Sequence, residues 1–191
     1  MTLSSLNQQL IGTLRDLYAV EVQLTKAIPR LLEVASADEL KSLLRRQLEE
    51  SEHHIDRLEG CAKSLQERLL GERSRPVDAL VKDALNLVES RGNECTIDLG
   101  LLNIMRHVKH HELAGYEYAR SLAEVLDEPD ITAFLDRILV DEEAVERALT
   151  VLAHDIMDTV VAQAVHDVSL GLTPLGIAMA SAEKTEFDTV G

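Results

Sequence analysis

The chain has 191 residues and a formal net charge of −15, and this length suits one domain or one domain with a tail. The acidic charge argues against nucleic acid or an anionic membrane surface as a partner, and it is compatible with attraction of metal cations. Apolar residues make up 46% of the chain and aromatic residues only 3%, so the core must consist mainly of Leu, Val, Ile and Ala, which favours packed helices over sheets.

The first part of the chain predicts two long helices. Leucines at three- and four-residue steps predict a helix over residues 3–34, which Pro29 should kink or end early. Ser36 or Asp38 then suits the cap of a second helix, over residues 38–71. The two helices together predict a helical hairpin.

The rest of the chain predicts one short helix and two long ones. The short helix covers residues 76–91, and the third long helix covers residues 95–126. The fourth long helix begins near residue 130 and reaches the apolar stretch after Ile156. Beyond it, we expect residues 170–191 to be extended, to be disordered or to pack on a partner.

The two halves of the chain resemble each other. A shift of 92 residues lays the start of the second helix on that of the fourth, with Asp38 on Asp130, although the match is imperfect elsewhere. Two helical hairpins joined by a long crossover are typical of ferritin-like bundles. We therefore expect an all-α, ferritin-like four-helix bundle with a short crossover helix over residues 1–160, and a C-terminal extension over 161–191.

Targeting features are few. Cys61 and Cys95 form no CxxC pair, so we expect a reducing compartment and a cytoplasmic location. The N-terminus has neither the charge cluster nor the continuous apolar segment of a signal peptide. No run approaches the roughly 18 consecutive apolar residues of a transmembrane helix, so we expect no membrane partner.

Each long helix interrupts its apolar stripe near its middle with charged residues or a histidine. The interrupting residues are Glu21, Glu50, His54, Lys109, Glu112, Glu142 and Glu146. The shift of 92 residues lays Glu50 on Glu142 and His54 on Glu146, so the interruptions follow the same internal repeat. Residues at i and i+4 point the same way on a helix. Glu50 with His54, and Glu142 with Glu146, can therefore each reach a shared centre.

This joint pattern predicts a metal site. Buried carboxylates at one level repel each other, and carboxylates and imidazole are natural ligands of iron and manganese. Taken singly, Glu21 would instead be a boundary residue whose stem reaches water, and His54 an ordinary hydrogen-bonded histidine. Glu50 and His53 also form an ExxH, the spacing of many di-iron bundles, so the histidine ligand of the second helix stays open.

Three stretches carry motifs of a known family. Residues 14–59 open with LRDLYAVE and contain a QLEES…H…RLE block, residues 107–126 read HVKHHELAGYEYARSLAEVL, and residues 141–153 follow more loosely. On these motifs the chain resembles the YciE/YciF-like (DUF892) branch of the ferritin-like superfamily over about residues 3–156. The resemblance implies a rubrerythrin-like bundle, a homodimer, an association with bacterial stress responses and a dinuclear iron or manganese site.

The resemblance also implies a ligand set. Matched residue by residue, the implied metal ligands are Glu21, Glu50, His54, Glu112, Glu142 and Glu146. Tyr18 and Tyr116, near the same level, suit hydrogen-bond donors to the ligands. The chain departs from the family in the third helix, where KHHE replaces EHYE and Lys109 takes the place of the first acid. A protonated lysine does not ligate a hard cation.

Three functions therefore stay open. A filled site supports iron binding and oxidation, or peroxide consumption, by a metal-dependent oxidoreductase. If Lys109 instead pairs with Glu112 and other carboxylates, the site holds one metal or none, and the chain is a stress-associated structural or binding protein. A closed iron-storage cage is the third interpretation, and the resemblance to dimeric proteins disfavours it.

Overall fold

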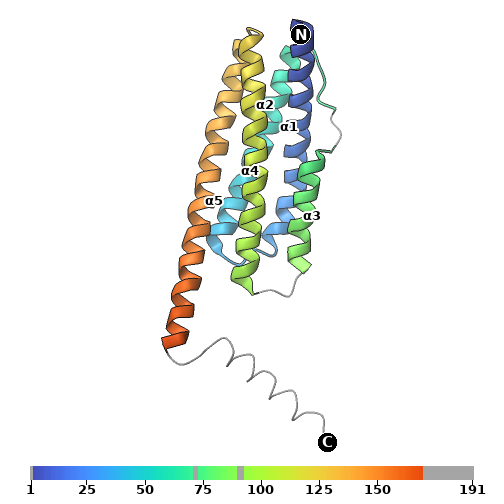
Figure 1. Ribbon diagram of the computed structural model, residues 1–191. Coiled ribbons are helices and arrows are strands. Elements are labelled where there is room, and N and C mark those ends of the chain that lie inside the picture. Colours follow the sequence, from blue (N-terminus) through green and yellow to red (C-terminus); the bar gives the residue numbers. More distant parts are fainter. Residues whose placement is uncertain (1, 71–72, 90–92, 170–191) are drawn as a thin grey trace, which may run out of the picture. The chain divides into compact units, whose positions relative to one another are not determined.

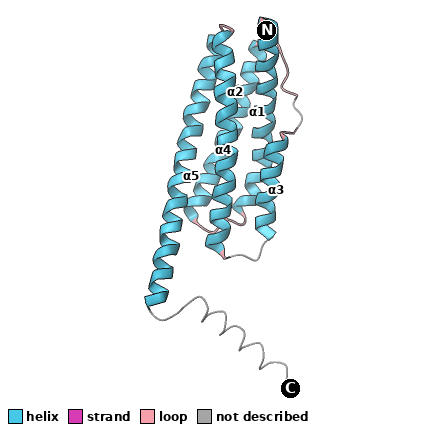
Figure 2. Cartoon of the chain, in the orientation of Figure 1, coloured by secondary structure: helices cyan, strands magenta, loops and turns pink. Residues whose placement is uncertain are grey.

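The computed structural model describes residues 2–70, 73–89 and 93–169, which form five α-helices joined by loops (Figure 2). The helices are α1 (Leu3–Leu32), α2 (Asp38–Ser64), α3 (Arg75–Glu89), α4 (Glu94–Val125) and α5 (Pro129–Ser169). The chain divides into two compact units, Met1–Ala153 and His154–Gly191, and the boundary falls within the length of α5.

The predicted all-helical bundle is confirmed. In the first unit α1, α2, α4 and the first part of α5 run side by side, and the short helix α3 lies along α1 and α4 as the crossover (Figure 1). The expectation for residues 170–191 lies outside the described residues. The domain boundary after residue 160, the homodimer and the cytoplasmic location stay predictions.

The second helix is shorter than predicted, because it ends at Ser64 and not near residue 71. Gln66 adopts a left-handed conformation with φ of 56°, and the amide of Glu67 donates to the carbonyl of Ala62 at 2.9 Å. This Schellman arrangement satisfies carbonyls that the helix end would otherwise leave unpaired. Helix α4 ends in the same way at Asp127, with φ of 58°. Neither left-handed residue is a glycine, which is the residue that most often takes this conformation at a helix end.

The start of α2 depends on a residue from another helix. The cap predicted at Ser36 or Asp38 is wrong, because the N-cap residue is Ala37, which makes no side-chain hydrogen bond. Instead the carboxylate of Asp98, on α4, accepts from the amide of Ser36 at 2.9 Å and from that of Ala37 at 2.8 Å. Asp98 is buried, so this cap in trans ties the two helical hairpins together.

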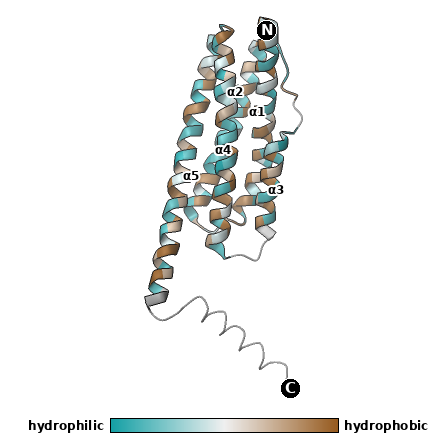
Figure 3. Cartoon of the chain, in the orientation of Figure 1, coloured by the Kyte–Doolittle hydropathy of each residue, from teal (hydrophilic) through white to brown (hydrophobic). Residues whose placement is uncertain are grey.

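The core of the first unit is mainly aliphatic, with a group of buried charged residues in its middle. Apolar and polar positions alternate along its helices (Figure 3). Leu10, Leu14 and Leu17 of α1 pack with Ile131, Leu135 and other residues in one buried cluster. A Cβ atom at Gly115 would lie 2.8 Å from a methyl carbon of Leu17, so glycine allows α1 and α4 to approach closely next to Tyr116.

Helix α5 contains an apolar stretch that is largely exposed. By length and composition alone, its segment Pro129–His166 could cross a membrane: the most apolar window has a mean hydropathy of 1.3, and 17% of that window is buried. One such helix is weak evidence of a membrane span, because packed helices of soluble proteins pass the same test. The exposed side chains include Val151 and Val161.

Candidate metal centre

Glu21 of α1, His54 of α2 and Glu142 of α5 meet in the core of the bundle. All three side chains have no exposed surface, and one ligand atom from each lies within 4.8 Å of the others. The Nδ1 atom of His54 is 3.1 Å from Oε1 of Glu21 and 3.1 Å from Oε1 of Glu142. Each residue takes a position in an apolar stripe, so the helical period turns it inward.

Lys109 of α4 is buried beside this triad. Its ammonium lies 2.7 Å from Oε2 of Glu112, on the next turn of α4, and also donates to Oε2 of Glu142. Lys109 and Glu112 have no exposed surface either. The carboxylate of Glu142 is therefore shared, with one oxygen facing His54 and the other facing Lys109.

The pKa values of the centre follow from burial and from these contacts. Burial would lower the pKa of His54, but the hydrogen bonds that its ring donates to Glu142 and Glu21 raise it to about 10. Burial would also lower the pKa of Lys109, but the charges of Glu112, Glu142 and Glu21 hold it above its usual value. Burial raises the pKa of Glu112, whereas Lys109 and His54 overcome burial and lower that of Glu142. Without a metal, both His54 and Lys109 are therefore cations.

Tyr116 contacts the triad, and Tyr18 does not. The Tyr116 hydroxyl donates to Oε1 of Glu21 at 2.5 Å, and its ring packs edge-on against His54 with centroids 6.1 Å apart. Burial and the charge of Glu21 raise the pKa of Tyr116 well above its usual value, so the phenol keeps its proton. Tyr18 instead donates to Glu59 at 3.2 Å, in a half-buried position. Of the two predicted tyrosines, Tyr116 is therefore the one that orients a triad carboxylate.

Two further predicted ligands lie at the edge of the core. Glu50 accepts from Arg46 at 2.7 Å, and Glu146 accepts from Arg106 at 3.2 Å and from Thr150 at 2.8 Å. Both glutamates have 17% of their side-chain surface exposed. Burial would raise the pKa of Glu146, but Thr150 and Arg106 lower it. The structure does not bring either residue into the triad, and their roles as ligands stay a prediction.

The structure also decides between the two histidines of α2. His53 is exposed, and its Nδ1 atom lies 2.7 Å from the carbonyl oxygen of Glu49, so His54 is the one that faces the core. Asp141 is a further residue near the centre that was not predicted: its Oδ2 lies 3.6 Å from Nε2 of His54 and accepts from Arg57 at 2.7 Å. Asp141 is next to Glu142 in the chain, but the three- and four-residue steps passed over it.

The residues of the centre fit a cation. In the centre, two buried carboxylate oxygens have no hydrogen-bond donor: Oε2 of Glu21 and Oε1 of Glu112. The single proton on Nδ1 of His54 also cannot satisfy both Glu21 and Glu142. A buried acceptor without a donor is costly, and a metal ion removes that cost. Carboxylate oxygens and an imidazole nitrogen suit iron and manganese.

Comparisons with known proteins agree with this fold. A family model described as "Domain of unknown function (DUF892)" matches residues 5–162. The chain is 29% identical over 155 residues to Protein YciF of Escherichia coli (strain K12), covering 80% of this chain and 93% of that protein.

Two solved structures are also similar. The E. coli stress protein YciF has a TM-score of 0.77 at 27% identity, covering 80% of this chain and 97% of that chain. YcfI, a putative structural protein from Rhodopseudomonas palustris, has a TM-score of 0.73 at 31% identity, covering 78% and 94%. The family match ends within α5, so the last turns of that helix lie outside it.

Proposed function

The chain belongs to the DUF892 family, and from this membership and its core geometry we propose that it binds one divalent iron or manganese ion through Glu21, His54 and Glu142. The observation that carries the proposal is the buried triad, with carboxylate oxygens that lack donors. When bound, the ion supplies redox chemistry toward oxygen or peroxide. The similarity to the stress protein YciF supports a role in a stress response.

Lys109 limits the centre to one ion. When all three are ionised, the carboxylates of Glu21, Glu112 and Glu142 contribute −3, and Lys109 contributes +1, so with a neutral His54 the sum is −2. One divalent ion neutralises this charge, whereas two would leave +2 in a core where unpaired charge is costly. The ammonium also contacts the oxygens of Glu112 and Glu142 that a second ion would need. We therefore propose a mononuclear centre in place of the dinuclear one that the family resemblance implies.

The surrounding residues prepare the ligands. Tyr116 holds Oε1 of Glu21 by a hydrogen bond, and burial of the triad excludes bulk water. To hold an ion through Nδ1, His54 would have to lose the proton on that atom, so binding would release a proton. On the other side of the ring, Asp141, held by Arg57, faces Nε2.

Metal analysis of the loaded protein tests the proposal. Purified chain is incubated anaerobically with Fe²⁺ or Mn²⁺ and desalted, and bound metal is measured by inductively coupled plasma mass spectrometry. We expect about one ion per chain, and at least about tenfold less in His54→Gln and Glu142→Gln, because each loses a ligand. Glu143→Gln, an exposed neighbour on α5, is the matched control and should bind like the unmodified chain. Less than about a tenth of an equivalent in the unmodified chain would contradict the proposal.

A metal-free structural bundle is the second candidate. The contacts of Lys109 with Glu112 and Glu142 favour it, because they already neutralise part of the buried charge. The similarity to YcfI, described as a putative structural protein, also supports it.

Lys109→Glu distinguishes the two candidates. This variant has four buried carboxylates and no buried ammonium, so its charge of −4 matches two divalent ions. If the unmodified chain binds one ion, we expect the count to rise toward two, while Lys109→Gln, which adds no carboxylate, stays near one. If only Lys109→Glu binds metal, the structural bundle is supported and the proposed metal-binding function is wrong.

A further inference from the structure

A pocket beside α1 takes no part in the metal centre. Its volume is about 310 Å³, which falls within the range of about 300 to 1,000 Å³ that small-molecule sites occupy. None of its lining residues is a proposed ligand of the metal. We call it the α1 pocket, and its lining consists of Tyr18, Ala19, Val22, Gln23, Lys26 and Arg73.

The charge of the α1 pocket is opposite to that of the chain. Lys26 and Arg73 line it, and its described lining includes no carboxylate, although the chain has 34 acidic residues and only 19 lysines and arginines. A second pocket, of about 290 Å³, follows the average instead, because its charged lining residues are all acidic: Glu124, Asp127, Glu128 and Asp136. The lining of the α1 pocket therefore favours an anion.

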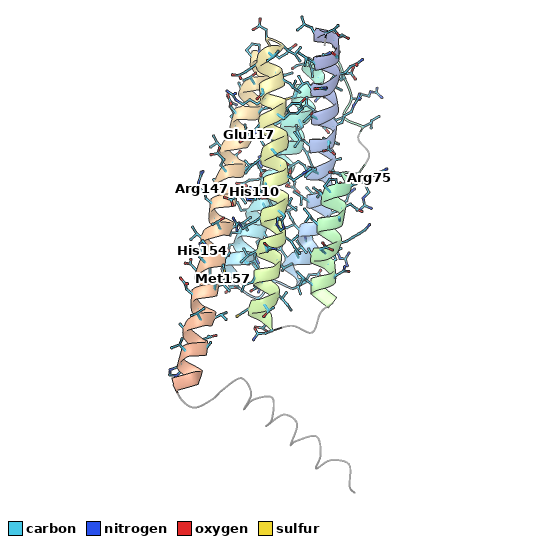
Figure 4. The ribbon with its side chains drawn as sticks, viewed as in Figure 1. Arg75, His110, Glu117, Arg147, His154 and Met157 are labelled. Atoms are coloured by element: carbon cyan, nitrogen blue, oxygen red, sulfur yellow. The ribbon has the colours of Figure 1, made fainter. Side chains whose placement is uncertain are left out.

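Gln23 fixes the segment that carries Arg73. Its Oε1 accepts from the amide of Ser74 at 2.7 Å, and its Nε2 donates to the carbonyl of the same residue at 3.4 Å. Both residues are buried, with Gln23 8% exposed and Ser74 2%. The segment then enters α3 at Arg75, beside α1 (Figure 4). The backbone next to Arg73 is therefore held against α1, which keeps the guanidinium at the pocket.

Both cations are available to a ligand. Lys26 is exposed and forms no ion pair with any residue that the structure describes. Arg73 lies 3.0 Å from Asp78, but 75% of its side-chain surface is exposed, so this pair is weak. Lys82 lies 2.8 Å from the other oxygen of Asp78. Asp78 therefore keeps a cation when Arg73 turns to a ligand.

The rest of the lining suits an apolar group. The hydroxyl of Tyr18 donates to Glu59, which does not line this pocket, so Tyr18 offers its ring. Ala19 and Val22 add aliphatic surface beside it. Aromatic and small aliphatic side chains bind planar organic groups. The α1 pocket therefore matches a ligand with an anionic end and an apolar body.

We propose that the α1 pocket binds a small phosphate monoester, with the phosphate at Lys26 and Arg73 and the organic group against Tyr18, Ala19 and Val22. A phosphate monoester carries a charge of about −1.5 to −2 at pH 7, which two cations match better than they match the single charge of a carboxylate. Arginine donates two parallel hydrogen bonds to phosphate, and lysine adds a compact charge. Binding requires no metal, so this proposal and the metal-binding function can fail independently.

Calorimetric titration of the full chain tests the proposal. The chain is first freed of metal with a chelator and desalted, so that phosphate finds no bound ion. The ligand is phenyl phosphate, and inorganic phosphate and benzoate are the comparisons. We expect one phenyl phosphate per chain with a dissociation constant of about 1 mM or lower, and at least about tenfold weaker binding of both comparisons. Inorganic phosphate lacks the apolar ring, and benzoate lacks the second charge.

Substitution of each cation then tests the location. Lys26→Gln and Arg73→Gln should each weaken the binding of phenyl phosphate by at least about tenfold, because each removes a charged donor. Arg30→Gln is the matched control: Arg30 is exposed on α1, one turn beyond Lys26, and does not line the pocket. It removes the same charge and should leave the affinity unchanged. Metal content after loading should be the same in all three variants.

Four outcomes would overturn the proposal. The unmodified chain could fail to bind phenyl phosphate at concentrations up to about 10 mM. Inorganic phosphate could bind as tightly as phenyl phosphate, so that the apolar lining takes no part. Benzoate could bind as tightly, which would assign the pocket to carboxylates. Finally, Lys26→Gln and Arg73→Gln could leave binding intact, or Arg30→Gln could weaken it equally, and the anion would then bind elsewhere.

Discussion

The buried centre and the rim of the same bundle neutralise glutamates in different ways. In the centre, Glu21 and Glu142 are fully buried and face His54 and Lys109. At the rim, Glu146 is 17% exposed and pairs with an arginine, and Glu50 does the same. All four glutamates lie on stripes that turn inward. The comparison teaches that spacing selects the face of a helix, whereas depth decides whether an arginine reaches the carboxylate from outside.

Removing the cation that pairs with each glutamate should give the largest difference in unfolding free energy between centre and rim. Lys109→Met leaves Glu112 and Glu142 without their cation, so we expect the metal-free chain to lose about 3 to 5 kcal/mol of unfolding free energy. Arg106→Met removes a partly exposed partner of Glu146 and should cost at most about 1 kcal/mol. Urea unfolding followed by circular dichroism, with a chelator present, measures both. Equal losses would show that depth does not separate the two regions.

The pH dependence of the metal-free chain should give the next largest difference. The pKa of His54 is about 10 in the folded chain and 6.5 ordinarily, so its protonated form stabilises the fold. That contribution is complete below pH 6.5 and is lost as the pH rises through 10. The urea midpoint should therefore fall between pH 7 and pH 10.

Two histidine variants check this assignment. His54→Gln should flatten the fall of the urea midpoint, because the titrating group is gone. His53→Gln, which removes the exposed neighbour, should keep it. If the fall survives in His54→Gln, another group causes it.

Removing the two tyrosine hydroxyls should give the smallest difference in unfolding free energy between centre and rim. Tyr116→Phe removes a buried donor to Glu21, and we expect a loss of about 2 kcal/mol in the metal-free chain. Tyr18→Phe removes a half-buried donor to Glu59 and should cost about 0.5 kcal/mol. The same urea experiment compares them, and a larger loss from Tyr18→Phe would reverse the order of centre and rim.

Much of the fold could be predicted because helical periodicity is local. The leucine steps located all four long helices and the crossover, and the internal repeat indicated two hairpins. The residues at which the helices begin and end were less predictable. Helix α2 ends at Ser64, just before the left-handed Gln66, and the amide of Ala37 at its start donates to Asp98, which is 61 residues further along the chain. No local pattern encodes a cap that comes from another helix.

The candidate site also has a part that could be predicted from the sequence and a part that could not. The sequence by itself determined that Glu21, His54, Lys109 and Glu142 turn inward, because their spacing along each helix places them on an apolar face. Only the tertiary structure decided that three of them converge and that Lys109 bridges Glu112 and Glu142. The physical reason is that convergence depends on how far four helices slide along one another. That stagger is set by packing across the whole core, which the period of a single helix does not contain.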